Sequence, residues 1–494
     1  MTFRSGRDHL LLALAVAACA AVYWPITRNY FMADDFVSLQ SIANDSLGRW
    51  LLQPASGHVL VIRNALFSLC HRLFGTWAAG YFWTVLLTHL VNVALLFAVA
   101  RRLTGSARLA CFGAALWGTS PTDEGSLGWY AVYGHVVVGT LVLVVLWRIA
   151  CRRSESGALR PAEVARWCGL LLAAAASFGV GVGVALVFPA VVLLLFPRSR
   201  TPRSVRTMLL AFPPVVITLY AGLYALYTGL YSPAPAASLL TMIGLLSRWP
   251  SVVAMVLHLL AAGIAGLVGS FAFPAGAYPT PAELGAAGLY AAAFAGALIA
   301  SPSAERRLLA ALGLLALGAY AVVAAGRAGL YVLVPAVPAY GAGAPRYHYV
   351  GPIALTIALC VVLARLGELS ALRPRARDAS LAAAFAIGAL LYARSGWRID
   401  HHRGDREAAE QVVRSIRATI ARTPPDRPVY IQNRPFPPAI VGAPYFAGWA
   451  SVFTIFFPHG AGRPVYFVED DSHVRAVARP GTPLAAILVP PAAG

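Results

Sequence analysis

Apolar stretches of about the length of a membrane-crossing helix recur along most of this chain, and short runs of arginine separate them. A helix needs about 20 mainly apolar residues to cross the hydrocarbon core of a bilayer. Only 12% of the residues are charged, about half the roughly 25% of a typical soluble domain. Too few polar side chains are therefore present to cover a soluble protein of 494 residues, and the sequence predicts a polytopic α-helical membrane protein.

The arginine runs also predict how the chain is threaded through the membrane. Under the positive-inside rule they mark cytoplasmic loops, which places the N-terminus in the cytoplasm before an uncleaved first helix. The net charge of +19 is divided among these loops, so we expect no nucleic-acid partner. We expect about 11–13 transmembrane helices, depending on whether 230–273 crosses the membrane. The other predicted spans are 9–26, 79–100, 107–121, 128–147, an out-and-back pair in 164–197, 207–228, 284–301, 308–326, 350–366 and 380–394.

The composition changes near Trp397, where acids, histidine and proline return and no apolar run is long enough to cross a membrane. Apolar residues have helical spacing in 403–422, and three short β-like runs follow. The sequence therefore predicts a transmembrane domain over 1–396 and a small periplasmic α/β domain over 397–494. The β-like runs are 429–431, 465–468 and 487–489.

Two pairs of adjacent acids lie just beyond predicted helix ends on the outer face. Asp34 and Asp35 lie among aromatic residues in the first outer loop, 27–78. Asp123 and Glu124 lie in the turn between the third and fourth spans. Ionised groups beside hydrocarbon are costly and usually functional, whereas a single pair is equally well explained as a solvated loop or a helix cap. Two pairs at one face favour a shared cleft.

Four basic residues of the outer segments are candidates for binding an anionic group. His58 and Arg63 belong to an amphipathic stretch that we expect to lie along the membrane surface. Arg346 and His348 directly precede an inward span. An arginine guanidinium can bind two phosphate oxygens at once, and snorkelling to lipid headgroups is the alternative explanation.

Other local motifs are few. His89 and Asn92 lie three residues apart within the second span, where hydrogen bonds to neighbouring helices are the simplest explanation. The sequence has no Walker loop, no GxGxxG leading into a helix, no HExxH and no GxSxG. ATP-driven transport and hydrolase activity therefore have no support from local motifs.

Four segments of the first 150 residues, about 30% of the chain, together resemble the GT-C superfamily of membrane glycosyltransferases, which includes protein O-mannosyltransferases and the lipid A aminoarabinose transferase. Two departures are visible. Residue 120 is Ser where the family turn often has His before its proline, and the loop pair is Asp-Asp where the best-known members have Asp-Glu. The four segments are Ala33-Asp34-Asp35-Phe36, the interfacial stretch 57–75, the helix Thr88-His89-Leu90-Val91-Asn92 leading to Arg101-Arg102, and the turn Ser120-Pro121-Thr122-Asp123-Glu124 before Trp129.

The resemblance implies a GT-C-like fold and an enzyme at the periplasmic face of a bacterial inner membrane. Its donor would be a polyprenyl-phosphate-linked sugar, and its acceptor a saccharide, a lipid or a protein. The resemblance implies that Asp34 or Asp35 is the general base. Asp123 or Glu124 would orient the acceptor or bind a possible divalent cation, although no cofactor is certain. The candidate ligands of the donor phosphate are Arg346, Arg63, His348 and His58.

Two other functions remain open at this point. A transporter or flippase for a lipid-linked saccharide would need ionisable groups inside the spans, and His89 and His258 are the best candidates there. A polysaccharide polymerase or ligase would share the lipid-linked donor but tends to rely on a large outer loop.

Overall fold

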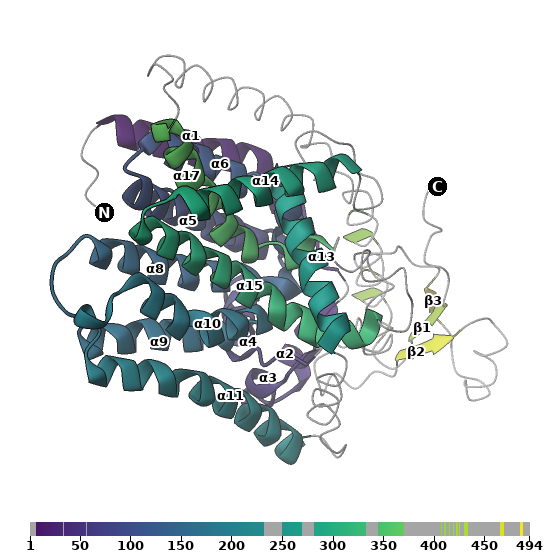
Figure 1. Ribbon diagram of the computed structural model, residues 1–494. Helices are drawn as coiled ribbons and strands as arrows, with labels where there is room; N and C mark the ends of the chain where they lie inside the picture. Colours follow the sequence, from purple (N-terminus) through teal and green to yellow (C-terminus); the bar gives the residue numbers. More distant parts are fainter. Residues whose placement is uncertain are drawn as a thin grey trace.

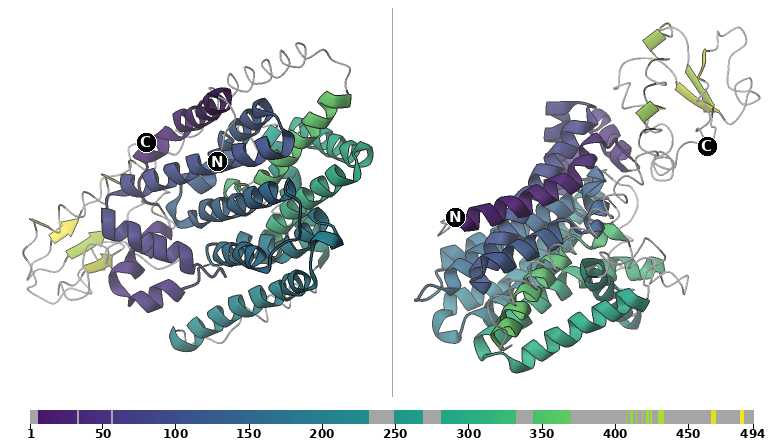
Figure 2. Two further views of the ribbon diagram at one scale, coloured as in Figure 1. Left: turned by 90° about the vertical axis from the view of Figure 1, so that its left-hand side faces the viewer. Right: turned by 90° about the horizontal axis from the view of Figure 1, so that it is seen from above.

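The described chain is a bundle of long apolar helices, with the short helices of the first outer loop gathered at one end of it (Figures 1 and 2). The structure is a computed structural model. It describes residues 6–32, 34–55, 57–231, 249–268, 281–331, 344–369 and parts of 407–487.

The helices of the bundle begin and end near the predicted limits of the spans. They are α1 (Gly6–Tyr23), α5 (Ala78–Thr104), α6 (Ala107–Gly118), α8 (Gly134–Arg153), α9 (Pro161–Ala175), α10 (Gly179–Leu195), α11 (Arg203–Tyr231), α13 (Trp249–Val268), α14 (Pro281–Ala300), α15 (Ser303–Tyr331) and α17 (Gly351–Leu369). The outer loops carry α2 (Asp34–Asn44), α3 (Leu47–Leu52), α4 (Val61–Phe74), α7 (Glu124–Leu127) and the short 3-10 turns η2 (Pro121–Asp123), η3 (Tyr130–Val132) and η5 (Pro345–Tyr347). Two further 3-10 turns are η1 (Trp24–Arg28) and η4 (Arg198–Arg200).

Within the described residues, six helices are long and apolar enough to cross a membrane, and three apolar helices of 10–17 residues accompany them. The polytopic α-helical class is therefore confirmed. The stretch that the sequence left undecided contains α13, which is one of the six. The predicted total of about 11–13 also counts α6 and α9, which have 12 and 15 residues. The predicted total further counts the span 380–394, which lies outside the described residues. Residues 232–248 lie outside them as well.

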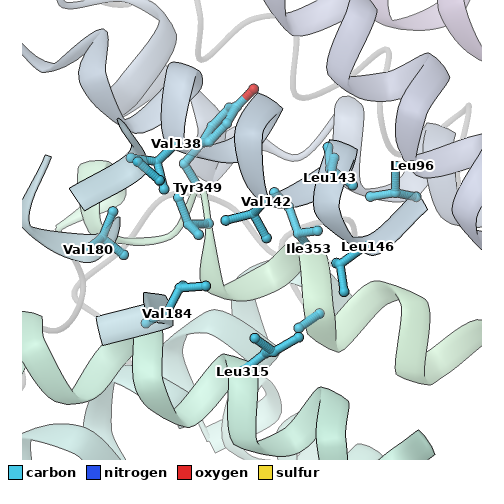
Figure 3. Packing of buried hydrophobic residues seen from close by; sticks show 14 of the residues in the cluster. Leu96, Val138, Val142, Leu143, Leu146, Val180, Val184, Leu315, Tyr349 and Ile353 are labelled. Carbon is cyan, nitrogen blue, oxygen red and sulfur yellow. The ribbon is translucent and has the colours of Figure 1, made fainter. Parts of the chain in front are cut away.

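Most helices of the bundle contribute to one apolar core, and Figure 3 shows how side chains of α5, α8, α10, α15 and α17 meet in part of it. Val138 and Val142 of α8 lie beside Val184 of α10, and Leu315 of α15 and Ile353 of α17 approach from the other side. Leu96 of α5 closes the same cluster. Because these side chains come from helices far apart in sequence, their packing fixes how the outer ends of the helices are placed.

Helices α10 and α15 pack against each other, and at Gly183 and Gly318 their backbones approach closely. A Cβ atom added to Gly183 would lie 2.0 Å from the carbonyl oxygen of Gly318. Small residues permit this kind of backbone approach between membrane helices. The pair of glycines therefore sets the position of α15, whose outer end carries Arg327.

The first outer loop is fastened to the bundle by backbone hydrogen bonds. Ile62 N donates to Ala176 O at 3.0 Å, in the turn between α9 and α10, the two helices of the out-and-back pair predicted in 164–197. Val59 N donates to the Tyr220 hydroxyl of α11 at 3.0 Å. Helix α4 buries Arg63 and exposes apolar side chains such as Leu69, as expected of a helix lying along the membrane surface.

Near the C-terminus the described residues include a three-stranded parallel sheet of order β2-β1-β3, made of β1 (Val429–Gln432), β2 (Val465–Val468) and β3 (Ala485–Ile487). The first two strands match the predicted runs, and the third shares residue 487 with its prediction. The residues of 403–422 that the structure describes are helical. The α/β domain over 397–494 stays a prediction.

Candidate active site

Asp35 ties the start of α2 to the loop before α8. Its side chain is fully buried, and it accepts hydrogen bonds from Met32 N at 3.0 Å and from Ala131 N at 2.5 Å. Burial raises the pKa of Asp35 to about 7, against the lowering effect of these two hydrogen bonds. Both carboxylate oxygens already have partners within the protein, so Asp35 holds the site in place.

Arg63 hydrogen-bonds to the same residue before α8, Ala131, through its backbone carbonyl. Its Nε donates to Ala131 O at 3.0 Å, and its terminal nitrogens donate to Asn64 Oδ1 at 2.8 Å and to Ser38 Oγ at 2.9 Å. The guanidinium also lies over the ring of Phe67, 5.2 Å from the ring centroid. Arg63 is 4% exposed, and burial lowers its pKa to about 10, which leaves it charged at neutral pH. Its donors thus serve the architecture of the loop.

Asp35→Ala is expected to lower the free energy of unfolding by about 1–3 kcal/mol, because the buried Ala131 N–H loses its acceptor. Thermal unfolding in detergent measures the loss. Asp35→Asn is the matched control, since its side-chain oxygen can still accept from Ala131. Equal stability of Asp35→Ala and the wild-type protein would contradict the tethering role.

Asp34, the first residue of α2, has a different environment from Asp35. It is partly exposed, and its buried Oδ1 has no hydrogen-bond partner among the described residues. Burial raises the pKa of Asp34 above its usual range, and the charge of Arg63 acts against this shift. Arg346 and Arg327 also lower that pKa, so three guanidinium groups lie within electrostatic reach of this carboxylate. Asp34 is the member of the pair that can still bind a ligand.

Arg346 and Arg327 both lie over the ring of Tyr347, at 4.8 Å and 5.9 Å from its centroid. Arg346 also lies 5.9 Å from the ring centroid of Trp129. Gly125 allows α7 to pack closely against η5, because a Cβ atom at residue 125 would lie 2.4 Å from the backbone nitrogen of Arg346. The outer end of α15, η5 and α7 thus bring two cations and two aromatic rings together.

The second acidic pair is divided in the same way as the first. Asp123 is completely buried, and neither of its carboxylate oxygens has a hydrogen-bond partner in the described chain. Burial raises the pKa of Asp123 well above its usual value. Glu124 is partly exposed at the start of α7, the helix that packs against η5. Of this pair, Glu124 is therefore the acid nearer to the surface.

The two candidate histidines pack against the bundle. The His58 ring lies 4.8 Å from the ring of Phe178, centroid to centroid, and burial together with the charge of Arg327 lowers its pKa to about 4. His58 is therefore neutral at neutral pH. His348 is 1% exposed, and its Nδ1 shares a hydrogen bond with the Tyr320 hydroxyl at 3.1 Å. The neutral His58 ring therefore offers no positive charge to a phosphate.

The polar pair of the second span makes the predicted interhelical hydrogen bonds. His89 Nδ1 and the Tyr349 hydroxyl are 2.9 Å apart, and Asn92 Nδ2 donates to the same hydroxyl at 3.0 Å and to Val136 O at 3.0 Å. These contacts join α5 to α8 and to the segment just before α17. They place Tyr349 beside the site without exposing it.

Arg327 and Trp129 are site residues to which the sequence assigned no role. A lone arginine at the outer end of an apolar helix runs against the positive-inside rule, and that exception is the signal that identifies Arg327 in the sequence. The sequence motif of the second acidic turn includes Trp129, but only the packing of distant segments brings this residue next to Arg346. For the possible divalent cation, the described residues contain no group of three or more His, Cys, Asp or Glu side chains placed to hold a metal.

The fold and the site together define a multi-pass membrane protein with acids, arginines and aromatic rings at one end of its helices. No protein-family model matches the chain, and no curated protein matches its sequence. The crystal structure of ArnT from Cupriavidus metallidurans bound to undecaprenyl phosphate is similar, with a TM-score of 0.54 and 14% sequence identity over 96% of this chain and 88% of that chain. The apo state of the same ArnT gives a TM-score of 0.51 at 14% identity, over 93% of this chain and 86% of that chain. The GT-C-like fold that the sequence motifs predict is therefore confirmed.

Proposed function

We propose that this protein is a membrane glycosyltransferase that moves a sugar from a polyprenyl-phosphate-linked donor to an acceptor at the periplasmic face of a bacterial inner membrane. The likeness to ArnT, crystallised with undecaprenyl phosphate, supports a lipid phosphate as part of the donor. The observation that carries the proposal is the environment of Asp34: its buried Oδ1 has no hydrogen-bond partner among the described residues, and the charges of Arg63, Arg346 and Arg327 act on its carboxylate.

In the proposed reaction, Asp34 accepts the proton of the acceptor hydroxyl as that oxygen attacks the anomeric carbon of the donor. A bond forms between the acceptor oxygen and the anomeric carbon, and the bond from that carbon to the phosphate oxygen breaks on the opposite side. Polyprenyl phosphate leaves with the bonding electrons, and Arg346 and Arg327 stabilise its negative charge. General-base assistance of this kind contributes about 10²–10⁴-fold to a rate.

Asp34 and Asp35 have separate roles in this proposal. Asp34 is the base because its Oδ1 has no hydrogen-bond partner among the described residues, whereas the carboxylate of Asp35 accepts from Met32 N and Ala131 N. Glu124 is assigned to orienting the acceptor, since it lies partly exposed beside the segment that carries Arg346.

The test uses the full-length protein in proteoliposomes with a panel of radiolabelled undecaprenyl-phosphate sugars and a membrane extract as acceptor source. A transferase releases free undecaprenyl phosphate and moves the label to another molecule. A flippase moves the intact labelled lipid between leaflets and releases nothing. Label movement without release, in wild type and in Asp34→Asn alike, would reject the proposal.

The pH dependence of transfer provides a separate check. A general base works only when deprotonated, so transfer is expected to increase as pH rises through the pKa of Asp34. Burial raises that pKa, which places the acid limb of the kcat/KM profile above the ordinary Asp value of about 3.9. The Asp35→Asn variant should keep this limb, since Asp35 is not the base. A limb at or below about pH 4, or one that disappears only in Asp35→Asn, would contradict the assignment.

A further inference from the structure

We infer that Trp129 determines which sugar the site accepts, by donating a hydrogen bond from its indole Nε1–H to a hydroxyl of the donor sugar. This inference rests on the proposed function, because it concerns the sugar that the polyprenyl phosphate carries. It adds a specificity-determining residue to the acids and arginines already described.

The indole N–H of Trp129 is buried and has no hydrogen-bond partner in the described part of the chain. Buried tryptophans normally use this donor, as two others here do. Trp50 Nε1 donates to Ser68 Oγ at 2.7 Å, and Trp117 Nε1 donates to Tyr349 O at 3.2 Å. A buried donor without an acceptor costs free energy and calls for an explanation, and a bound ligand supplies one.

The position of Trp129 is fixed by the residues that build the site. Two residues further along the chain, the backbone of Ala131 is held by Asp35 through its N–H and by Arg63 through its carbonyl. On its other side, the Arg346 guanidinium lies 5.9 Å from the Trp129 ring centroid. The indole is therefore held next to the cation that we assign to the donor phosphate.

This position selects the donor sugar as the partner of the indole. The sugar is joined to the phosphate through a single oxygen atom, so a ring that packs against the phosphate-binding guanidinium lies within the length of one sugar. Among the described residues, the Nε1–H of Trp129 is a buried donor without a hydrogen-bond partner, and its ring lies 5.9 Å from the Arg346 guanidinium. A hydroxyl of the donor sugar can accept this N–H, which an acyl or polyprenyl tail cannot do.

A site that hydrogen-bonds a substrate hydroxyl discriminates strongly against an analogue lacking it, because the buried protein group is then left unpaired. The experiment measures the affinity of the full-length protein in nanodiscs for undecaprenyl phosphate and for its mannosyl, glucosyl, galactosyl and aminoarabinosyl forms. The ratio of the affinity for a glycosylated lipid to that for bare undecaprenyl phosphate isolates the contribution of the sugar. Singly deoxygenated analogues of the preferred sugar complete the panel.

Trp129→Phe keeps an aromatic ring and removes the N–H. We expect it to lower the ratio for the preferred sugar roughly 5- to 100-fold and to leave binding of bare undecaprenyl phosphate unchanged, which shows that the variant is folded. One deoxy analogue should bind wild type and Trp129→Phe equally. Trp117→Phe is the matched control: it loses a structural hydrogen bond and should keep the wild-type ratio.

Two results would overturn the inference: the same ratio in wild type and Trp129→Phe, or wild-type protein that binds no glycosylated lipid more tightly than the bare one. Failure of the proposed function has a different signature. In that case the sugar-dependent ratio is lost in Trp129→Phe as expected, but wild-type protein transfers no sugar from the donor that it binds.

Discussion

Asp34→Asn is expected to reduce sugar transfer by about 10²–10⁴-fold, the contribution of a positioned general base. The amide has nearly the shape of the carboxylate but cannot take the proton of the acceptor hydroxyl. It also removes a negative charge near Arg346 and Arg327, so the affinity for undecaprenyl phosphate should stay the same or increase. A fall in kcat without a loss of lipid-phosphate binding is therefore the specific signature of this role.

Asp45→Asn is the matched control for this variant, because Asp45 lies in the same loop and, among the described residues, forms its ion pair with Arg49, at 3.5 Å. Exposed pairs of this type contribute little to stability, so its transfer rate should equal that of wild type. A fall of less than tenfold in Asp34→Asn at matched expression would remove Asp34 as the base. The same fall in both variants would indicate a general effect on the loop.

Gly183→Leu is expected to lower the free energy of unfolding by about 3 kcal/mol or more, at the upper end of the cost of overpacking. The first side-chain atom would lie 2.0 Å from the carbonyl oxygen of Gly318, so α10 and α15 must separate. Because α15 carries Arg327 at its outer end, transfer should fall together with stability. Thermal unfolding in detergent and the transfer assay measure the two effects.

Gly296→Leu is the control for Gly183→Leu. Gly296 lies on α14 with no atom within 4 Å of an added Cβ, and leucine is a better helix former than glycine. This variant should be at least as stable as wild type. If the two variants behave alike, close contact between α10 and α15 is not what positions the site.

The sequence by itself determined the kind of protein and the helices of the bundle. Apolar runs of the required length, separated by arginine, leave few alternatives to a polytopic helical protein, because an unpaired backbone cannot be accommodated in hydrocarbon. The out-and-back pair in 164–197 was visible as well, because this apolar run is too long for one span; α9 and α10 are its two helices. The acidic pairs predicted a candidate site at this end of the bundle, since adjacent carboxylates beside a membrane are costly.

Only the tertiary structure distinguished the members of each pair. Asp34 and Asp35 are adjacent in sequence, yet Oδ1 of Asp34 has no hydrogen-bond partner in the part of the chain that the structure describes, while Asp35 accepts from the backbone N–H of Ala131, 96 residues away. Arg63, a predicted phosphate ligand, donates a hydrogen bond to the backbone carbonyl of Ala131. Arg327 enters the site from a distant helix. Sequence patterns report which groups lie at the membrane surface, whereas the partner of each group depends on long-range packing that brings distant segments together.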